Sequence, residues 1–514
     1  MLVRNARRRY CEALACVAAL AACSELIGIE ELESGPRGGD AGGAGRAANG
    51  GDTSEAGAAP SSGTGGSSAG RAGSAGQSSA GTSSGAAAGA GDPGSAGQPG
   101  EGGEGGEGGA PIDDPTVRGR VIDLVGQVVP RASVTIGDTT VTTDAEGEFV
   151  IDDVAGSYDA AIVVTLSNSR SGMYAWVYQG LTRRDPTLQV YRGLSDRYAQ
   201  SHIQVTNGVY GEPPFTTVAF GGPNGSDSVS MSSGNLIVSL DWYGPAQTSG
   251  NVHALRWNTD ANELPTAYQA YAVRSVTLDA TASGDAEIPI ALPSSAVASG
   301  TISGEVTAVT DVSRNNYVFV RFDDGAAIGV VDHSTTTAAF SYRVPTLPQS
   351  VVTVAATEGN TPGQFSVAHA DVMPGATNIA LSLPTAPTQT APVPADLNDP
   401  VLPVVDDTTM FRWTNSGRVS VLHVEDTGVY RGLFVVTSAR QIALPSVPGF
   451  TLRAGAEHFW QVERHGDLVS VDQAAGPEGF QDAFGAGWTE PNGRTRGPGV
   501  FAQSYRSYFT TAAP

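Results

Sequence analysis

The stretch ASVTIGDTTVTTDAEGEFVI, residues 132–151, contains the pattern from which the fold of this chain can be inferred. Apolar and polar residues alternate on both sides of the segment TDAEG, residues 143–147, as they do in strands with one buried face. Asp and Gly in that segment favour a tight turn. The alternating apolar residues are Ala132, Val134, Ile136, Phe149 and Ile151. Short strands joined by such turns predict an antiparallel β-sandwich.

The residues around this stretch also fit a known pattern. Its matching positions are Gly119, Val121, Asp123, Gly126, Pro130, Ala132, Val134, Thr143, Asp144, Gly147, Phe149, Val154, Gly156 and Tyr158. Together they resemble the carboxypeptidase regulatory-like domain, a transthyretin-type sandwich, over residues 116–194, with residues 127–129 lengthening one hairpin. The resemblance implies an accessory module whose relatives of similar shape bind carbohydrate, but it identifies no ligand residue. Asp144 and Glu146 suit calcium, although a turn explains them without a metal.

Two later segments of the chain resemble each other. Residues 259–268 parallel residues 357–365, and residues 288–293 parallel residues 379–384. Alternation of apolar and polar residues within each copy is typical of strands. The sequence therefore predicts two copies of one all-β unit, which span residues 195–296 and 297–386.

The last unit, residues 387–514, resembles a fibronectin type III domain. Trp413 stands where that family has an early core Trp, and Leu452 with Gly455 matches the turn before its tyrosine corner. His458 occupies the position of the corner Tyr, which departs from the family pattern. The resemblance implies a fourth β-sandwich.

The N-terminus has the layout of an export signal. Four arginines precede an apolar run over residues 13–22, and residues 20–23 read LAAC. This arrangement resembles a bacterial lipoprotein signal, which implies cleavage after residue 22 and acylation of Cys23. The Ser24 that follows implies sorting to the outer membrane of the cell envelope. An ordinary secretory peptide is the alternative interpretation.

Residues 23–115 form a linker between this anchor and the first sandwich. They consist mainly of Gly, Ala and Ser, with few apolar side chains to bury. Such a segment cannot offset the entropy lost on ordering, so we expect it to be disordered. As a flexible coil it would span about 50–60 Å.

Composition excludes several classes of site. The formal net charge is −23, so the chain should be repelled by nucleic acid. All three cysteines, at positions 11, 16 and 23, lie in the signal region, and a lipidated Cys23 leaves no thiol for a disulfide or a metal site. No cofactor motif is present, and none of the seven histidines forms a metal-spaced pair.

Candidate ligand-binding residues come from aromatic rows and an acidic linker. Aromatic residues suited to stacking on sugar rings are Tyr174, Trp176, Tyr178, Phe480, Phe484 and Trp488. The first three alternate along one strand, and we favour core packing for them because large aromatic side chains are mostly buried. For Phe480 and Phe484, four residues apart, we favour one helical turn that covers the edge of the sandwich. Asp396, Asn398 and Asp399 resemble part of the calcium-binding linker of cadherins, although Pro400 replaces a ligand residue. A plain acidic linker is the alternative.

These features together predict an all-β chain, with tandem antiparallel β-sandwich domains after a disordered linker. No catalytic motif is recognisable, so we expect a non-enzymatic, lipid-anchored protein that acts as a surface binding or scaffold module. Its partner would be a polysaccharide or another envelope protein. An adhesin-like or spacer role is the alternative, and a glycosidase with two distant carboxylates is a remote one.

The anchor gives the first testable prediction. Cells fed an alkyne fatty acid should label the wild-type protein, whereas Cys23→Ser should abolish the label and release the protein from membranes, because the acylated thiol is lost. Ser24→Ala serves as the matched control and should keep the label. Persistent labelling of the Cys23→Ser variant would contradict the lipoprotein interpretation.

Overall fold

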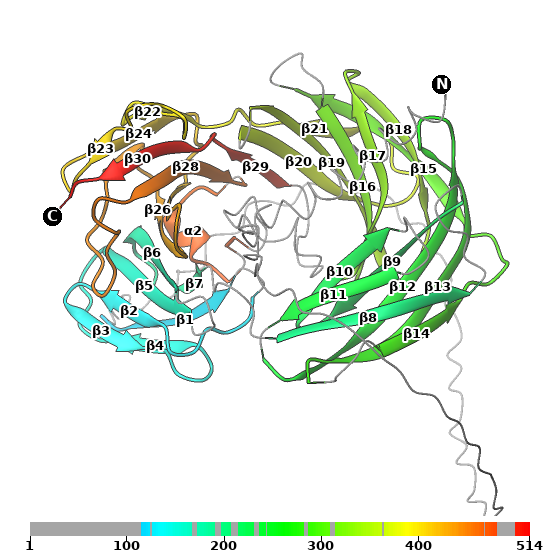
Figure 1. Ribbon diagram of the computed structural model, residues 1–514, viewed down its shortest axis with the longest axis horizontal. Helices are drawn as coiled ribbons and strands as arrows, with labels where there is room; N and C mark the ends of the chain where they lie inside the picture. Colours follow the sequence, from blue (N-terminus) through cyan, green and yellow to red (C-terminus); the bar gives the residue numbers. More distant parts are fainter. Residues whose placement is uncertain are drawn as a thin grey trace, which may run out of the picture. The chain divides into compact units, whose positions relative to one another are not determined.

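A computed structural model describes residues 115–513 apart from 124–125, 167–171, 191–196, 207–213, 231–235, 243, 282–285, 309–313, 362–363, 467, 478 and 481–498. The described part of the chain consists of β-strands with one short helix, α2 (Val471–Ala474) (Figure 1). The prediction of an all-β chain built from sandwiches is therefore confirmed. The signal and the linker lie outside the described residues.

The first unit has seven strands in two sheets, ordered β4-β1-β7 and β3-β2-β5-β6. Its strands are β1 (Val117–Asp123), β2 (Ser133–Ile136), β3 (Thr139–Thr142), β4 (Glu148–Ile151), β5 (Tyr158–Leu166), β6 (Gly172–Leu181) and β7 (Thr187–Val190). β1 pairs antiparallel with β4 and parallel with β7. Apolar side chains from both sheets fill the space between them.

The second and third units repeat this strand order. Their sheets are β11-β8-β14 with β10-β9-β12-β13, and β18-β15-β21 with β17-β16-β19-β20. The strands of the second unit are β8 (Arg197–Thr206), β9 (Phe215–Gly222), β10 (Gly225–Ser230), β11 (Leu236–Trp242), β12 (Gln247–Thr259), β13 (Pro265–Asp279) and β14 (Ala286–Ala291). Those of the third are β15 (Ser299–Thr307), β16 (Arg314–Phe322), β17 (Ala327–Thr335), β18 (Ala339–Pro345), β19 (Ser350–Thr361), β20 (Gln364–Val372) and β21 (Ile379–Ser382).

All three units thus share one topology. In each, the first strand lies between the fourth and the seventh, and the second sheet runs third, second, fifth, sixth. The two segment pairs that resemble each other in sequence fall at equivalent places, the connection after the fifth strand and the seventh strand. The sequence indicated this equivalence only for the second and third units, and the structure extends it to the first.

The last unit has a different strand order. Its sheets are β22-β24-β27 and β26-β25-β28-β30, with β29 and β23 added at the edges. The strands are β22 (Thr388–Ala391), β23 (Val404–Val405), β24 (Met410–Thr414), β25 (Ser420–Asp426), β26 (Arg431–Thr437), β27 (Gln441–Ala443), β28 (Glu457–His465), β29 (Gly499–Gln503) and β30 (Ser507–Thr511). Trp413 is buried in the core, and its Nε1 donates to the hydroxyls of Ser416 and Ser420. His458 Nε2 contacts the Arg453 carbonyl oxygen at 3.2 Å.

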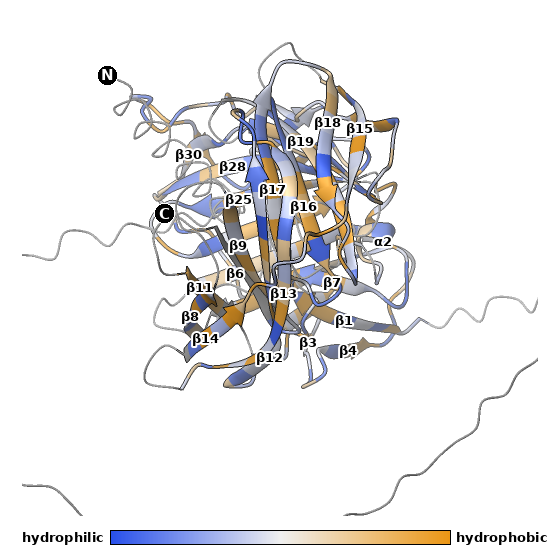
Figure 2. Ribbon diagram, turned by 90° about the vertical axis from the view of Figure 1, so that its right-hand side faces the viewer, coloured by the Kyte–Doolittle hydropathy of each residue, from blue (hydrophilic) through white to orange (hydrophobic). Residues whose placement is uncertain are grey.

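Strand formation follows the alternation read from the sequence. Figure 2 shows hydrophilic and hydrophobic residues alternating along the strands. The turn after β3 forms because Asp144 Oδ1 accepts hydrogen bonds from the backbone amides of Glu146 and Glu148. Gly147 follows with a φ of 75°, a conformation that a residue with a Cβ rarely adopts. Asp144 and Glu146 therefore belong to a turn.

Backbone pairing also joins three of the units into one sheet of 14 strands. β26 of the last unit pairs parallel with β6 of the first, with Arg431 opposite Met173 through to Val436 opposite Tyr178 (Figure 1). β29 pairs antiparallel with both β28 and β20, which brings in the third unit. Backbone hydrogen bonds therefore connect these units, in addition to the chain segments between them.

The turn at Gly147 gives a second prediction. Gly147→Ala should destabilise the first unit more than Gly137→Ala does. Both positions have positive φ, 75° and 57°, so each alanine is strained by about 1–2 kcal/mol. At Gly147 alone the new Cβ would lie 2.7 Å from the Val121 carbonyl oxygen, whereas at Gly137 no atom lies within 4 Å. Overpacking of this kind adds about 1–3 kcal/mol. Urea denaturation measures both variants, and equal losses would contradict this explanation.

Candidate functional site

A row of directly opposed side chains crosses seven strands on one face of the joined sheet. Its members are Val141, Val134, Ile162, Trp176, Phe434, His423 and Gln461, on β3, β2, β5, β6, β26, β25 and β28. The row is apolar from Val141 to Phe434, and it becomes polar at His423 and Gln461 of the last unit. The candidate site lies where the apolar part of the row meets the polar part.

Stacked rings occupy the centre of the row. Trp176 stacks on Phe434 with ring centroids 4.4 Å apart, and Phe434 stacks on His423 at 4.2 Å. Opposed aromatic pairs of this kind stabilise strand pairing by roughly 0.2–1 kcal/mol each. The rings therefore bridge the boundary between β6 and β26.

Burial of the aromatic row on β6 contradicts the sugar-stacking hypothesis and supports core packing, the interpretation that the sequence favoured. Tyr174, Trp176 and Tyr178 are only 1%, 4% and 0% exposed. They pack with apolar residues of the first unit and with Val421, Phe434 and Val436 of the last. A sugar ring needs an open aromatic face, and β26 together with the core covers this one. Alternation alone could not distinguish the two outcomes, because it is the same for a buried and an exposed row.

Phe480 is also buried, with 2% of its surface exposed. It makes an edge contact with Trp176 at 6.3 Å and lies 6.4 Å from the ring of Tyr178. Val471 and Ala474 of the short helix α2 belong to the same cluster, and this helix is capped by Ser470, whose side chain accepts a hydrogen bond from the Gln473 amide. Phe484 and Trp488 lie outside the described residues.

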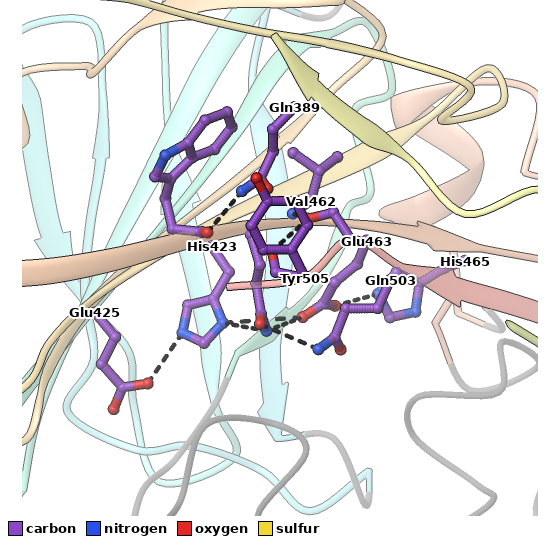
Figure 3. A network of polar contacts seen from close by, with 11 residues as sticks. Gln389, His423, Glu425, Val462, Glu463, His465, Gln503 and Tyr505 are labelled. Carbon is purple, nitrogen blue, oxygen red and sulfur yellow. Dashed lines mark hydrogen bonds and ion pairs between the residues drawn. The ribbon is translucent and has the colours of Figure 1, made fainter. Parts of the chain in front are cut away.

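Charged side chains gather next to the stacked rings, on β25 and β28. The odd-numbered residues of both strands face away from the core of the last unit, since Leu422, Val424, Trp460 and Val462 line that core. Five of these outward residues are nevertheless buried and polar: His423, Glu425, Gln461, Glu463 and His465. We call this set the His–Glu network (Figure 3).

Amide hydrogen bonds orient the centre of the His–Glu network. Gln503 Nε2 donates to Gln461 Oε1 at 3.1 Å, which leaves Gln461 Nε2 to donate to His423 Nδ1 at 3.1 Å. An Nδ1 that accepts carries no hydrogen, so the ring hydrogen of His423 lies on Nε2. His423 Nε2 lies 3.2 Å from Glu425 Oε2. The imidazole thus stands between an amide and a carboxylate.

The two ends of the network are also paired. His465 Nε2 donates to Glu463 Oε2 at 2.6 Å, and Tyr174 of the first unit donates to Glu425 Oε1 at 3.3 Å. Burial alone would raise the pKa of Glu463, but the hydrogen bond and charge of His465, with His423 nearby, hold its pKa below the ordinary value. Buried charges are tolerated in proteins when they are paired in this way.

The geometry argues against catalysis at the two carboxylates. A glycosidase holds a substrate between its acid pair. Here the His423 ring lies between Glu425 and Glu463, with Nε2 3.2 Å from one carboxylate and Nδ1 3.9 Å from the other. In the described residues no group of three or more His, Cys, Asp or Glu side chains could hold a metal ion. Through Glu425 the network also bonds to Tyr174 of the first unit.

Sequence reasoning missed the His–Glu network. The signal was an alternation of polar residues, HVE in β25 and QVERH in β28, at positions where neighbouring strands carry apolar side chains. Strand register, which places His423 opposite Gln461, cannot be read from that signal. The structure thereby brings His423 and His465 to the same carboxylate, although their sequence spacing gives no hint of it.

Another buried histidine makes a polar contact between the second and third units. His253 on β12 lies 2.9 Å from the Tyr271 hydroxyl through Nδ1 and 2.8 Å from Asp324 Oδ2 through Nε2. Asn251 Nδ2 donates to the same Asp324 oxygen at 2.8 Å. Burial would raise the pKa of Asp324, but the hydrogen bonds from His253 and Asn251 keep it below the ordinary value. The turn between β16 and β17 is thus held against β12.

The candidate calcium residues form a turn. Asp399 Oδ2 accepts a hydrogen bond from the Asp396 amide at 2.8 Å, and the Asp399 amide donates to the Asp396 carbonyl at 3.0 Å. Asn398 lies between them in the same turn. The structure thus gives these acidic side chains a local role, which agrees with the plain linker interpretation.

Comparison with known proteins adds little beyond the fold class. No model of a protein family matches the sequence, and no curated protein matches it. The chain is similar to the Bacillus anthracis TIE protein at 10% identity, over 52% of this chain and 49% of that one, with a TM-score of 0.15. It thus spans about half the length of that structure.

Two further solved structures are similar over shorter parts of the chain. One is a putative adhesin from Bacteroides ovatus, at 10% identity over 37% of this chain and 95% of that one, with a TM-score of 0.14. The other is the shaft pilin SpaA from Lactobacillus rhamnosus GG, at 10% identity over 37% and 98%, with a TM-score of 0.13. These scores are too low to carry a functional argument. Among the described residues, no helix is long and apolar enough to cross a membrane.

The paired state of Glu463 gives a third prediction. Its pKa in the folded protein lies below the reference value of 4.5, so its contribution to stability is complete above that pH and is lost as the pH falls through the folded pKa. Glu463→Gln should lower stability at pH 7 by about 1.5–3 kcal/mol, because a hydrogen bond to a charged group is lost. Between pH 5 and pH 3 the variant should lose less stability than the wild type.

Urea midpoints across this pH range measure both effects. Glu287→Gln, at an exposed position of β14, is the matched control and should follow the wild-type pH dependence. Parallel pH curves for Glu463→Gln and the wild type would contradict the paired carboxylate.

Proposed function

We propose that this protein is a non-enzymatic, lipid-anchored component of the cell envelope that acts as an adhesin-like scaffold and contacts another envelope protein. The observation that carries the proposal is the joined sheet, in which strands of the first, third and last units are hydrogen-bonded to one another. Domains connected only by flexible linkers would not need such pairing. A fixed body suits a protein that presents surfaces at defined spacing.

The contacts that support a fixed body are of three kinds. Six residue pairs link β26 to β6, five link β29 to β20, and buried side chains of the second unit pack among those of the third. The His–Glu network and the His253–Asp324 contact add polar bonds at the same boundaries. Relative motion of these units would break buried hydrogen bonds, which is costly.

A polysaccharide as the main ligand has less support. Four of the six aromatic residues considered for sugar stacking are buried: Tyr174, Trp176, Tyr178 and Phe480. The chain has a net charge of −23, and an acidic surface favours a partner with basic groups. We therefore place a protein partner before a carbohydrate, and both before a glycosidase, because His423 separates the two buried carboxylates.

Photo-crosslinking on intact cells tests this function and gives a fourth prediction. A photoreactive residue replaces an exposed apolar side chain, Tyr198 at 51% or Val401 at 82% exposure, and the buried Leu422 at 0% serves as the control position. At least one exposed position should give a discrete adduct with another envelope protein, and Leu422 should give none.

In a second experiment the full-length protein is purified and tested for binding to a panel of polysaccharides and for hydrolysis of glycosidase substrates. The proposal expects no binding and no release of reducing sugar. Specific binding to one polysaccharide without any protein adduct, or catalytic turnover, would overturn it.

A further inference from the structure

The sixth strand of each repeated unit lies at the edge of that unit's own sheet, where another strand can pair with it. In the first unit this strand is β6, and β26 covers its outer edge. In the third unit it is β20, and β29 covers it. The equivalent strand of the second unit is β13, whose only partner strand among the described residues is β12. Near its start the Val297 amide donates to the Tyr268 carbonyl oxygen at 3.0 Å, so the open part of the edge lies beyond Tyr268. Two of three equivalent edges are thus occupied.

β13 is well suited to strand pairing. At 15 residues it is the longest of the described strands, and Val273 near its middle is 53% exposed. Natural edge strands are usually protected by charges, prolines or short length. Between residues 266 and 278 the only charged side chain is Arg274, which donates to the Pro289 carbonyl oxygen, and there is no proline.

The direction of the backbone groups follows from the hydrogen bonds at one end of β13. Ala280 donates through its amide to the Ala246 carbonyl oxygen, so Ala280 faces the β12 side. Neighbouring residues in a strand point their amides and carbonyls to opposite sides. Every second residue from Asp279 back to Tyr271 therefore faces outward: Asp279, Thr277, Ser275, Val273 and Tyr271. The next irregularity in register lies beyond them, at Arg256 and Trp257 of β12.

We propose that the outer edge of β13 is a self-association surface, on which β13 of a second copy pairs antiparallel about a two-fold axis near Ser275. Val273 of one copy then lies opposite Thr277 of the other, and two four-stranded sheets become one sheet of eight. An interface of this kind uses the same patch on both copies, as two-fold symmetry requires. It goes beyond the proposed scaffold role and does not depend on it.

Charge favours a second copy at this edge. Each copy has a net charge of −23, so two copies repel over most of their surface. From residue 265 to residue 278 the chain has no Asp or Glu. The pairing sets β-branched residues opposite each other, a combination that stabilises strands. No acidic pair meets within the paired segment.

The test uses the full mature chain in detergent, studied by sedimentation equilibrium. Val273→Pro removes an amide that points outward, so it blocks strand addition while leaving the bonds to β12 intact. Val273→Thr keeps the amide and is the matched control. The wild type and Val273→Thr should dimerise, and Val273→Pro should dimerise at least ~10-fold more weakly, equivalent to about 1.4 kcal/mol. Thermal midpoints compared at a concentration low enough for all variants to be monomeric should be equal, which shows that the proline variant remains folded.

Engineered thiols give a second readout that does not depend on proline. Ser275→Cys should form disulfide-linked dimers under mild oxidation, because the two-fold axis brings residue 275 of both copies together. Val150→Cys, at a position 46% exposed on β4, is the control and should stay monomeric. A monomeric wild type, unchanged dimerisation of Val273→Pro, or cross-linking of Ser275→Cys to a different protein instead of itself would overturn the proposal.

Discussion

The backbone pairing of β6 with β26 is the constraint on which the rest of the structure depends. It joins residues more than 250 positions apart, from Met173 opposite Arg431 to Tyr178 opposite Val436. Because of it the inner face of the first unit continues onto the outer face of the last, so Phe434 and Val436 share a core with Trp176. The stacked rings, the short helix and Phe480 all pack on this continuous face.

The same pairing brings a side chain of the first unit to a buried carboxylate of the last. His423 and Glu425 would face solvent on an isolated last unit, since they point away from its core. In the structure both side chains are buried, and Glu425 accepts a hydrogen bond from Tyr174 of the first unit. A buried charge needs a partner, and each carboxylate of the His–Glu network has one. Polar pairing at such a joint favours one register over others, because a shifted register would leave charges unpaired.

Much of the fold could be predicted from the sequence because its signals are local. Alternation around residues 132–151 predicted strands, and Asp144 with Gly147 predicted the turn between them. Pairing between units could not be predicted in the same way. The row of Tyr174, Trp176 and Tyr178 alternates identically whether its strand lies at an open edge or beside β26. The site was hidden for the same reason, since His423 meets Gln461 only through strand register.

Residue-resolved hydrogen exchange across residues 432–436 tests the central claim most directly. β26 is an inner strand, with β25 on one side and β6 on the other. Amides of neighbouring residues point to opposite sides, so an inner strand protects all of its amides and an edge strand protects every second one. An inner β26 should show slow exchange at every residue from Gly432 to Val436 in the full-length protein. Alternating slow and fast exchange along this segment would contradict it.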